Sequence, residues 1–391
     1  MTVKYSDIVS PIHSRALRHS GLSSAQVPLV SLVVPAHNAE RFIEGTIRSL
    51  LSQTYRHIEV IVIDDGSSDR TAALVTSIQE EDPRVVLLRQ ANLGVAAARN
   101  AGIERARGEL IAPVDADDLW YPRAIEKLAG CLDEQGPGVG IAYAWSAYID
   151  EQGLLTGGFR AATLEGDVFA TLLCHNFLGN ASCTMLRREC FDVTGGYDSG
   201  FREHAEQGCE DWDFYLRVSE HYHFRVVPEL LIGYRKVAGR MSSDSERMAR
   251  SHSYMLQKVY KRHPRLPGFL SRISKSSFYL YLADEGGPAS RGAWLRRAFA
   301  SAPLLCLIRP RFYMLWVVDV FLSDSRSDIG TIPRTSDDGH SLESIRQRKW
   351  RLHTMLTAQK VFHSLLRIHD GARLSKAGIA GGETASGASD R

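Results

Sequence analysis

Between residues 29 and 114, short apolar segments alternate with longer segments of helical pattern, and this alternation constrains the fold more than any other feature. It predicts strands at 29–34, 58–63, 85–88 and 110–114, and helices at 40–52, 70–81 and 94–107. Strands that alternate with helices of roughly 10–15 residues are typical of a parallel sheet with both faces covered. We therefore predict an α/β fold with a mostly parallel sheet and flanking helices.

Polar residues follow each of these predicted strands. The polar tips are residues 35–38, 64–69, 92–94 and 115–118. The carboxyl ends of parallel strands meet at one edge of a sheet, and ligands bind at that edge. The tips therefore predict a single binding site.

The last tip brings the carboxylates of Asp115, Asp117 and Asp118 close together. A hard divalent cation relieves their mutual repulsion, and Mg²⁺ and Mn²⁺ prefer oxygen ligands. We predict that Asp117 binds the metal and that Asp115 contacts the nucleotide. Asp118 would either support these two residues from behind or cap a helix. The alternative is a solvated loop in which an aspartate caps a helix.

Asp65 directly follows the second predicted strand. Its carboxylate can accept a hydrogen bond from a ring N–H, such as N3–H of uracil or thymine. The alternative is that residues 64–69 form only a turn before a capped helix. Arg99 lies in a helix rich in small residues, where it faces either a phosphate, the aspartates or solvent.

Glu210, Asp211 and Trp212 open a predicted helix at 211–220. Acidic residues are stabilised at a helix N-terminus by the helix dipole, which is one explanation of this motif. The other is that Asp211 acts as a general base, with Glu210 and Trp212 shaping the acceptor pocket.

The chain has 391 residues and a formal charge of +2. It has no basic stripe interleaved with aromatic residues, so nucleic-acid binding is not expected. The six cysteines form no close Cys-x-x-Cys pair, which argues against a zinc site and suits reduced thiols in the cytosol. Neither a signal peptide nor an ordinary transmembrane helix is expected.

Beyond residue 139 the alternation changes. We predict strands at 140–149, 181–186, 224–227 and 230–234, and helical segments at 245–262, 268–285, 294–300, 304–322 and 341–368. The expected organisation is an N-terminal extension (1–27), a sheet domain (28–240), a C-terminal helical region (241–370) and a disordered tail (371–391).

The motifs together resemble those of family 2 glycosyltransferases, which have the GT-A fold. They lie at 35–40, 53–55, 59–67, 92–94, 98–100, 115–118, 195–197 and 210–212. The resemblance covers roughly residues 29–240 and rests on the order and spacing of the whole set. It implies a Rossmann-like nucleotide-binding sheet, to which the C-terminal helices are an appendage.

The resemblance also implies an activity, an inverting sugar transfer from a nucleotide sugar, with UDP favoured and Mn²⁺ or Mg²⁺ as cofactor. Asp211 would deprotonate the acceptor hydroxyl, and Asp117 would bind the metal that bridges the diphosphate. Asp65 would bind the base, and residues 35–38 would pack on uracil and ribose. The residues that would contact the nucleotide sugar are Pro35, Ala36, His37, Asn38, Glu40, Asp65, Arg99, Asp115 and Ala116.

This sequence departs from the family pattern at two places. His37 stands where an aromatic residue is common, and it can still stack on a base. No histidine follows Tyr234-Arg235, so a further protein ligand for the metal is missing. Arg235, Lys236 or Arg240 would then contact the diphosphate instead.

Residues 304–322 are apolar, are interrupted by charged residues and follow several arginines. This pattern is typical of an interfacial segment at the membrane surface, and the basic helix at 341–368 would add attraction to anionic lipid. The alternative is a helix packed within the protein or at a dimer interface. Because acceptors in this family are often lipid-linked saccharides, we expect a role in cell-surface polysaccharide synthesis at the cytoplasmic face of the membrane.

Three other function classes agree less well with the sequence. A nicotinamide-dependent oxidoreductase is disfavoured because no Gly-x-Gly-x-x-Gly follows the first strand. A sugar nucleotidyltransferase shares the α/β core, but it usually carries a Gly-rich, basic loop where this chain has residues 35–38. A degenerate transferase that only binds nucleotide sugars would be expected to lack Asp117 or Asp211, and both are present.

Overall fold

A computed structural model describes residues 27–204, 207–237, 243–285 and 288–309. The expectations for residues 1–26, 341–368 and 371–391, and for most of 304–322, lie outside the described residues. Within them, no disulfide joins any of the six cysteines.

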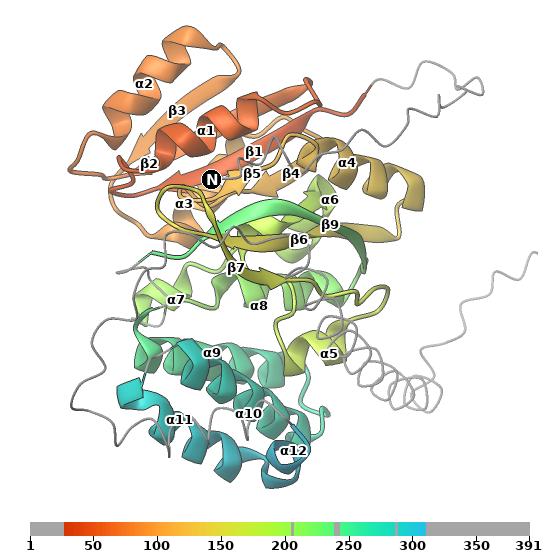
Figure 1. Cartoon of the computed structure of the whole chain (residues 1–391). Helices are drawn as coiled ribbons and strands as arrows, with labels where there is room; N and C mark the ends of the chain where they lie inside the picture. Colours follow the sequence, from red (N-terminus) through yellow and green to blue (C-terminus); the bar gives the residue numbers. More distant parts are fainter. Residues whose placement is uncertain (1–26, 205–206, 238–242, 286–287, 310–391) are drawn as a thin grey trace, which may run out of the picture.

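The described residues contain a nine-stranded sheet with the order β3-β2-β1-β4-β8-β6-β9-β5, and β7 pairs with β6 (Figure 1). The strands are β1 (Val30–Ala36), β2 (Ile58–Asp65), β3 (Val85–Gln90), β4 (Leu110–Pro113), β5 (Leu119–Trp120), β6 (Val139–Ile149), β7 (Leu155–Arg160), β8 (Thr184–Arg187) and β9 (His223–Arg235). Pairing is parallel from β3 through β2 and β1 to β4. It is antiparallel where β8 joins β4 and β6. The predicted α/β fold is confirmed, and the sheet as a whole is mixed.

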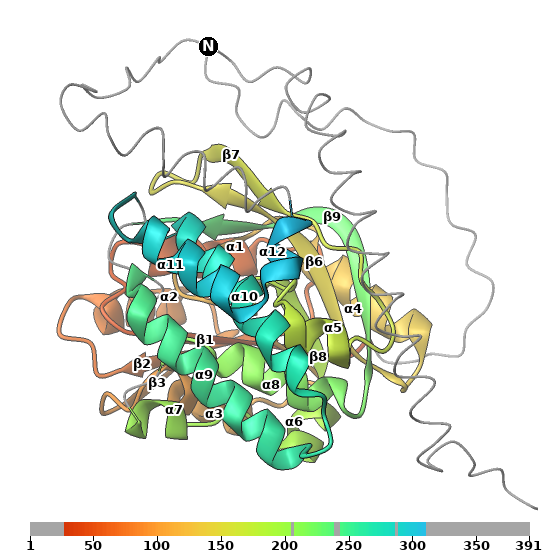
Figure 2. The same ribbon diagram turned by 90° about the horizontal axis from the view of Figure 1, so that it is seen from below.

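Helices cover both faces of this sheet (Figures 1 and 2). One face carries α1 (Ile43–Leu51), α2 (Thr71–Glu81) and α4 (Ala124–Gln135). The other carries α3 (Val95–Arg105), α6 (Arg188–Thr194) and α8 (Glu210–Ser219). Shorter elements are α5 (Phe169–Cys174), the 3-10 turn η2 (Ala181–Cys183) and α7 (Gly200–Glu203).

Alternate residues of the parallel strands enter two different apolar clusters. Leu32 and Val34 pack among α1, α2 and α4, whereas Val33 packs with α3 and α8 on the opposite face. Ile61 and Val62 of β2 divide in the same way. Successive side chains of a strand point to opposite faces, so a strand buried on both must be apolar throughout. This is why these strands are continuous apolar runs in the sequence.

The C-terminal helices are α9 (Ser245–Arg262), α10 (Gly268–Glu285), α11 (Pro288–Ser301) and α12 (Pro303–Leu307). They lie beyond α8, away from the parallel strands (Figure 1). Met255, Leu282 and Trp294 belong to the same apolar cluster as Val33 of β1. The predicted helical C-terminal region is confirmed for these residues, and it shares a core with the sheet. The boundary at residue 240 stays a prediction.

Three predicted strands differ from the structure. The segment 181–186 begins as the 3-10 turn η2, and only Thr184–Arg187 extends as β8. The segments 224–227 and 230–234 are a single strand, β9, which runs through Pro228. Its register against β6 shifts between Val227 and Leu230, so a bulge accommodates the proline. A bulge removes residues from the ladder, which lets a strand tolerate a residue without an N–H group.

Gly102 permits the close packing of α3 on the sheet. A methyl group at Gly102 would lie 2.5 Å from Ile63 Cδ1 and 2.5 Å from Val33 Cγ1. We expect Gly102→Ala to lower the free energy of unfolding by about 1–3 kcal/mol, because the sheet core must expand. Gly130→Ala on α4, where nothing lies within 4 Å, is the matched control and should raise stability by up to about 1 kcal/mol. Urea denaturation measures both, and equal effects would contradict this account of packing.

Candidate active site

The polar tips of β1 and β2 are joined by hydrogen bonds at the carboxyl edge of the sheet. His37 Nδ1 lies 2.9 Å from the Asp65 carbonyl oxygen. The Asn38 backbone N–H donates to Ser67 Oγ at 2.9 Å, and Asn38 Oδ1 accepts from the Ser68 N–H at 2.9 Å. Asn38 has a φ of 50°, in the left-handed region that asparagine tolerates. His37 and Asn38 are exposed and define the rim of the site.

Asp65 holds the loop that follows β3. Its buried carboxylate accepts hydrogen bonds from Gln90 Nε2 at 2.7 Å and from the backbone N–H groups of Leu93 and Gly94, both at 2.8 Å. A carboxylate offers about four lone-pair positions, so about one remains for another donor. Asp64 faces the other way and pairs with Arg89 at 3.5 Å.

Other predicted donor residues also contribute to loop structure. Glu40 Oε2 accepts from the Arg70 backbone N–H at 3.0 Å, which ties the β1 tip to the loop before α2. The Ala116 carbonyl accepts from Thr46 Oγ1 at 2.9 Å. Pro35 and Ala36 are buried within β1 rather than in the loop beyond it.

Arg99 joins the aspartate tip to the other side of the site. Its guanidinium donates to Asp115 Oδ1 at 2.7 Å and lies 5.1 Å from the centre of the Tyr197 ring. The Asp115 backbone N–H donates to Ser182 Oγ at 2.9 Å. Arg99 is buried, so the helix-surface alternative does not apply.

Asp118 is fully buried beneath the same tip. Asn180 Nδ2 donates to Asp118 Oδ2 at 2.5 Å, and the Arg235 backbone N–H donates to Asp118 Oδ1 at 2.9 Å. Burial, with repulsion from Asp117 and Asp115, raises the pKa of Asp118 well above its usual range. Asp118 therefore supports the tip from below and has no exposed surface for a ligand.

Arg235 fixes the aspartate tip from behind. Its Nε donates to the Asp117 carbonyl at 2.7 Å, and its Nη1 donates to the carbonyls of Asp150 at 2.5 Å and Glu151 at 2.8 Å. The expectation that Arg235 contacts a diphosphate is therefore wrong, because its donors bind the chain's own backbone. Lys236 binds Glu285 at 2.7 Å, and Arg240 lies outside the described residues.

Sequence reasoning missed Asn180 and assigned Arg235 to the wrong partner. Asn180 also lies 3.4 Å from Asp115 Oδ2, so one amide contacts two aspartates of the tip. Both residues are distant in sequence from the tip that they hold, and no local spacing pattern marks such a contact.

Asp211 lies in the first turn of α8, on the Arg99 side of the site. Its Oδ1 accepts from the Trp212 backbone N–H at 2.7 Å. Burial raises the pKa of Asp211 to about 7, with Arg99 opposing the shift and Glu210 adding to it. A carboxyl group with this pKa exchanges a proton near neutral pH, as a general base requires.

The structure buries the side chains of both Glu210 and Trp212. Trp212 is 3% exposed, its indole N–H donates to the Leu172 carbonyl at 2.8 Å, and its ring packs against His252 and Phe278. This is a correction to the sequence-based prediction, since the indole belongs to the core. Glu210 is also buried, and its Oε2 accepts from the Gly208 N–H at 2.7 Å.

Among the described residues, no cluster of three or more histidine, cysteine, aspartate or glutamate side chains is arranged to hold a metal ion. Asp115 is paired with Arg99 and Asp118 is buried. Asp117, which is partly exposed, is the remaining aspartate of the tip.

Comparison with known proteins now identifies the domain. Residues 31–194 match the family described as Glycosyl transferase family 2. This part of the chain belongs to that family. The expected enzyme class, a glycosyltransferase, is confirmed at the level of this family 2 domain.

Two relatives and one solved structure place the family 2 domain among known proteins. The chain is 31% identical to Escherichia coli chondroitin synthase over 199 residues, which are 50% of this chain but only 27% of that protein. It is 29% identical over 232 residues to an uncharacterized glycosyltransferase of Haemophilus influenzae, covering 55% of this chain and 68% of that one. The crystal structure of S. aureus TarS 1-349 with UDP-GlcNAc superposes with a TM-score of 0.51 and 16% identity, covering 74% of this chain and 88% of TarS. This likeness confirms the GT-A fold.

Proposed function

We propose that this protein is an inverting glycosyltransferase that moves a sugar from a UDP-sugar to a hydroxyl group of a saccharide or lipid-linked saccharide, in the synthesis of a cell-surface polysaccharide. The observation that carries the proposal is the buried carboxyl group of Asp211. It has a pKa of about 7 and interacts with the charges of the Arg99–Asp115 pair. The family 2 domain supports a sugar transfer. The TarS complex with UDP-GlcNAc, a structure of the same fold, supports UDP as the nucleotide.

In the proposed reaction, the acceptor hydroxyl gives its proton to the Asp211 carboxylate as its oxygen attacks the anomeric carbon. The bond between that carbon and the diphosphate oxygen breaks, and the electron pair leaves with the diphosphate. Attack from the face opposite the leaving group inverts the anomeric configuration. Arg99 pairs with Asp115 and also acts on Asp211, where its positive charge favours the ionised form of the base. The same charge can stabilise negative charge on the donor.

The donor base would lie on the rim formed by His37 and Asn38. The remaining lone-pair position of Asp65 can accept the N3–H of uracil. Glu40, Ala116, Pro35 and Ala36 would then act through the loops that they hold rather than by direct contact.

A divalent cation, Mn²⁺ or Mg²⁺, fits the aspartate tip only if the ligand supplies most of the coordinating oxygens. Asp117 would be the main protein ligand, because its side chain is partly exposed whereas Asp118 is buried. Magnesium commonly takes one or two carboxylates with water and phosphate oxygens. When bound, the ion would neutralise charge on the leaving diphosphate.

Replacement of Asp211 tests the proposed function. We expect Asp211→Asn to lower kcat by about 10²- to 10⁴-fold, because an amide cannot accept the proton, while UDP binding changes less than about twofold. Asp192→Asn, an exposed acid on α6, is the matched control and should retain activity. Transfer from a panel of UDP-sugars to saccharide acceptors measures kcat, and calorimetry measures UDP binding.

The same base predicts a pH dependence. Because Asp211 must be ionised, kcat/KM should fall about tenfold per pH unit below pH 7 in the wild-type protein. Transfer that is unchanged in Asp211→Asn would contradict the base assignment. A folded wild-type protein that binds UDP but transfers no sugar would instead support the nucleotide-sugar-binding alternative.

The metal assignment can be tested without activity. UDP with Mn²⁺ should raise the melting temperature more than UDP alone, because a ligand that binds only the folded state stabilises it. In Asp117→Asn the Mn²⁺-dependent part of this increase should disappear, whereas Asp192→Asn should keep it. An undiminished Mn²⁺ effect in Asp117→Asn would overturn the assignment.

We also propose that the C-terminal end of the described chain contacts a lipid surface at the cytoplasmic face of the membrane. Leu304 and Ile308 are 80% and 75% exposed, and Arg296 of the neighbouring α11 is exposed as well. Apolar side chains beside basic ones suit a surface of anionic lipid. The helices in the described ranges are all too short or too polar to cross a bilayer.

Vesicle sedimentation of the full chain tests this contact. We expect the chain to bind vesicles of phosphatidylcholine with phosphatidylserine more tightly than vesicles of phosphatidylcholine alone. The double variant Leu304→Asp/Ile308→Asp should lose about fivefold or more in vesicle affinity, since burying each apolar side chain in lipid stabilises the bound state by about 1–3 kcal/mol. Leu155→Asp changes an exposed leucine of β7 and is the control. Equal binding by both variants would refute a role for α12.

A further inference from the structure

Arg202 of α7 connects the segment before α8 to the rim on which the nucleotide base is proposed to bind. Its Nη1 donates to Asn92 Oδ1 at 2.6 Å. Its stem lies against the same loop, because a methyl group on Gly94 would lie 2.9 Å from Arg202 Cδ. Gly94 is also the residue whose backbone N–H donates to Asp65. Arg202 therefore contacts the loop between β3 and α3 at two neighbouring points, beside the proposed base-binding carboxylate.

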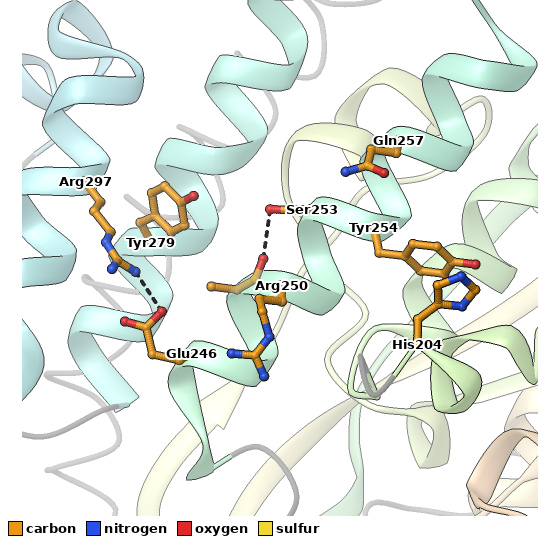
Figure 3. Close-up of a pocket in the computed structure, with 9 residues that line it drawn as sticks. His204, Glu246, Arg250, Ser253, Tyr254, Gln257, Tyr279 and Arg297 are labelled. Carbon is orange, nitrogen blue, oxygen red and sulfur yellow. Dashed lines mark hydrogen bonds and ion pairs between the residues drawn. The ribbon is translucent and has the colours of Figure 1, made fainter.

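The other side of α7 is anchored on α9 by aromatic contacts. The buried Phe201 ring meets Tyr254 edge to face, with the ring centroids 5.0 Å apart. The His204 ring stacks on the same tyrosine at 4.8 Å, and Figure 3 shows these two rings next to each other. Arg202 lies between Phe201 and His204 in the chain, so its backbone is held from both sides. Its side chain is the part of α7 that extends to the loop after β3.

Arg202 also fixes the direction in which the Asn92 amide points. A guanidinium carries only hydrogen-bond donors, so the Asn92 atom that it contacts is the oxygen, and the amino group points elsewhere. That amino group lies 3.3 Å from His37 Nδ1 and 3.2 Å from His37 Nε2. An atom in the ring plane that was equally close to both nitrogens would overlap the carbon between them. The amino group therefore lies over the face of the imidazole, where an N–H group is weakly attracted to the ring.

The remaining contacts of His37 hold the ring by its edge. Nδ1 donates to the Asp65 carbonyl at 2.9 Å, because a carbonyl oxygen carries no hydrogen. In the neutral ring Nε2 is then an acceptor, and the Asn38 amino group lies 3.3 Å from it. The ring is exposed, and one of its faces lies against Asn92. The opposite face is therefore the one that the exposed ring can offer to a flat ligand.

We propose that Arg202 is a positioning residue for the base of the nucleotide sugar. It holds Asn92 against one face of His37 and thereby fixes the opposite face as the surface on which uracil stacks. This inference deepens the proposed function and rests on it, because it takes the His37 rim as the place where the base binds. It also gives the segment that leads into α8, and so to Asp211, a part in shaping the nucleotide site.

Uridine separates this role from a direct contact with phosphate. It has the base and ribose but no charged group, so an arginine that acts only on the base affects uridine and UDP alike. We expect Arg202→Met to weaken the binding of both by about fivefold, corresponding to about 1 kcal/mol, because the Asn92 amide is no longer held. Arg202→Lys, which also carries only hydrogen-bond donors, should bind both within about twofold of the wild type.

The measurements are ligand-observed NMR for uridine and calorimetry for UDP, both on the full chain. Arg105→Met removes an exposed arginine at the far end of α3 and is the matched control, which should bind uridine and UDP as the wild type does. Equal uridine affinities in the wild type and Arg202→Met would overturn the proposal. So would a loss of UDP affinity without a loss of uridine affinity, which would indicate a phosphate contact.

A double-mutant cycle tests whether Asn92 carries the effect. In the Asn92→Ala background, Arg202→Met should change uridine affinity by less than about 1.5-fold, because the residue through which it acts is gone. Equal losses of about fivefold in both backgrounds would overturn the positioning role. If the wild type binds neither uridine nor UDP up to about 10 mM, the proposed nucleotide site and the role of Arg202 both fail.

Kinetics distinguish this inference from the proposed function. In Arg202→Met the KM for the nucleotide sugar should rise about fivefold, while kcat and the KM for the acceptor change less than about twofold. A fall in kcat with an unchanged KM for the nucleotide sugar would contradict the role of Arg202. Failure of sugar transfer in the wild type, with uridine binding and the cycle as expected, would count against the proposed transfer and not against Arg202.

Discussion

The arrangement of the candidate site depends on how the chain holds the buried carboxyl group of Asp118. This group lies beneath the aspartate tip, where removal from water disfavours its charge. Its partners are the amide of Asn180 and the backbone N–H of Arg235, which belong to a loop before η2 and to the end of β9. Three separate parts of the chain therefore meet at one carboxyl group, and Asp115 and Asp117 are positioned by that meeting.

Arg235 makes the arrangement rigid because it satisfies backbone groups rather than side chains. Its guanidinium binds the carbonyls of Asp117, Asp150 and Glu151, and its Cζ atom lies 4.7 Å from the centre of the Phe42 ring. A buried carbonyl that loses its donor costs about 1–3 kcal/mol. The loop that carries Asp117 is thus held through its backbone by a residue more than one hundred positions further along the chain.

The fold was largely predictable because its signals are local. Apolar alternation at the periods of strand and helix is visible in any short window, and parallel pairing places the strand tips at one edge. The roles of the tip residues were harder to predict, since Asp65 and Glu40 hold loops that are distant in sequence, by bonds to backbone N–H groups. Trp212 shows the same limit. An indole at a helix start suits a pocket or a core equally well, and only the packing of α9 and α10 decides between them.

The C-terminal helices affect the site through α8. Asp213, two residues after Asp211, is fully buried and pairs with Arg217 at 3.0 Å and with Lys258 of α9 at 3.2 Å. A buried carboxylate is tolerated only when paired, and loss of one partner leaves an uncompensated charge. The position of Asp211 is therefore coupled to α9. The 3.6-residue period of α9 places Lys258 and Ser251 close together on the side that faces α8. One helix thus holds both ends of the first turn of α8, through Ser251 at Cys209 and Lys258 at Asp213, and so fixes the position of the proposed base between them.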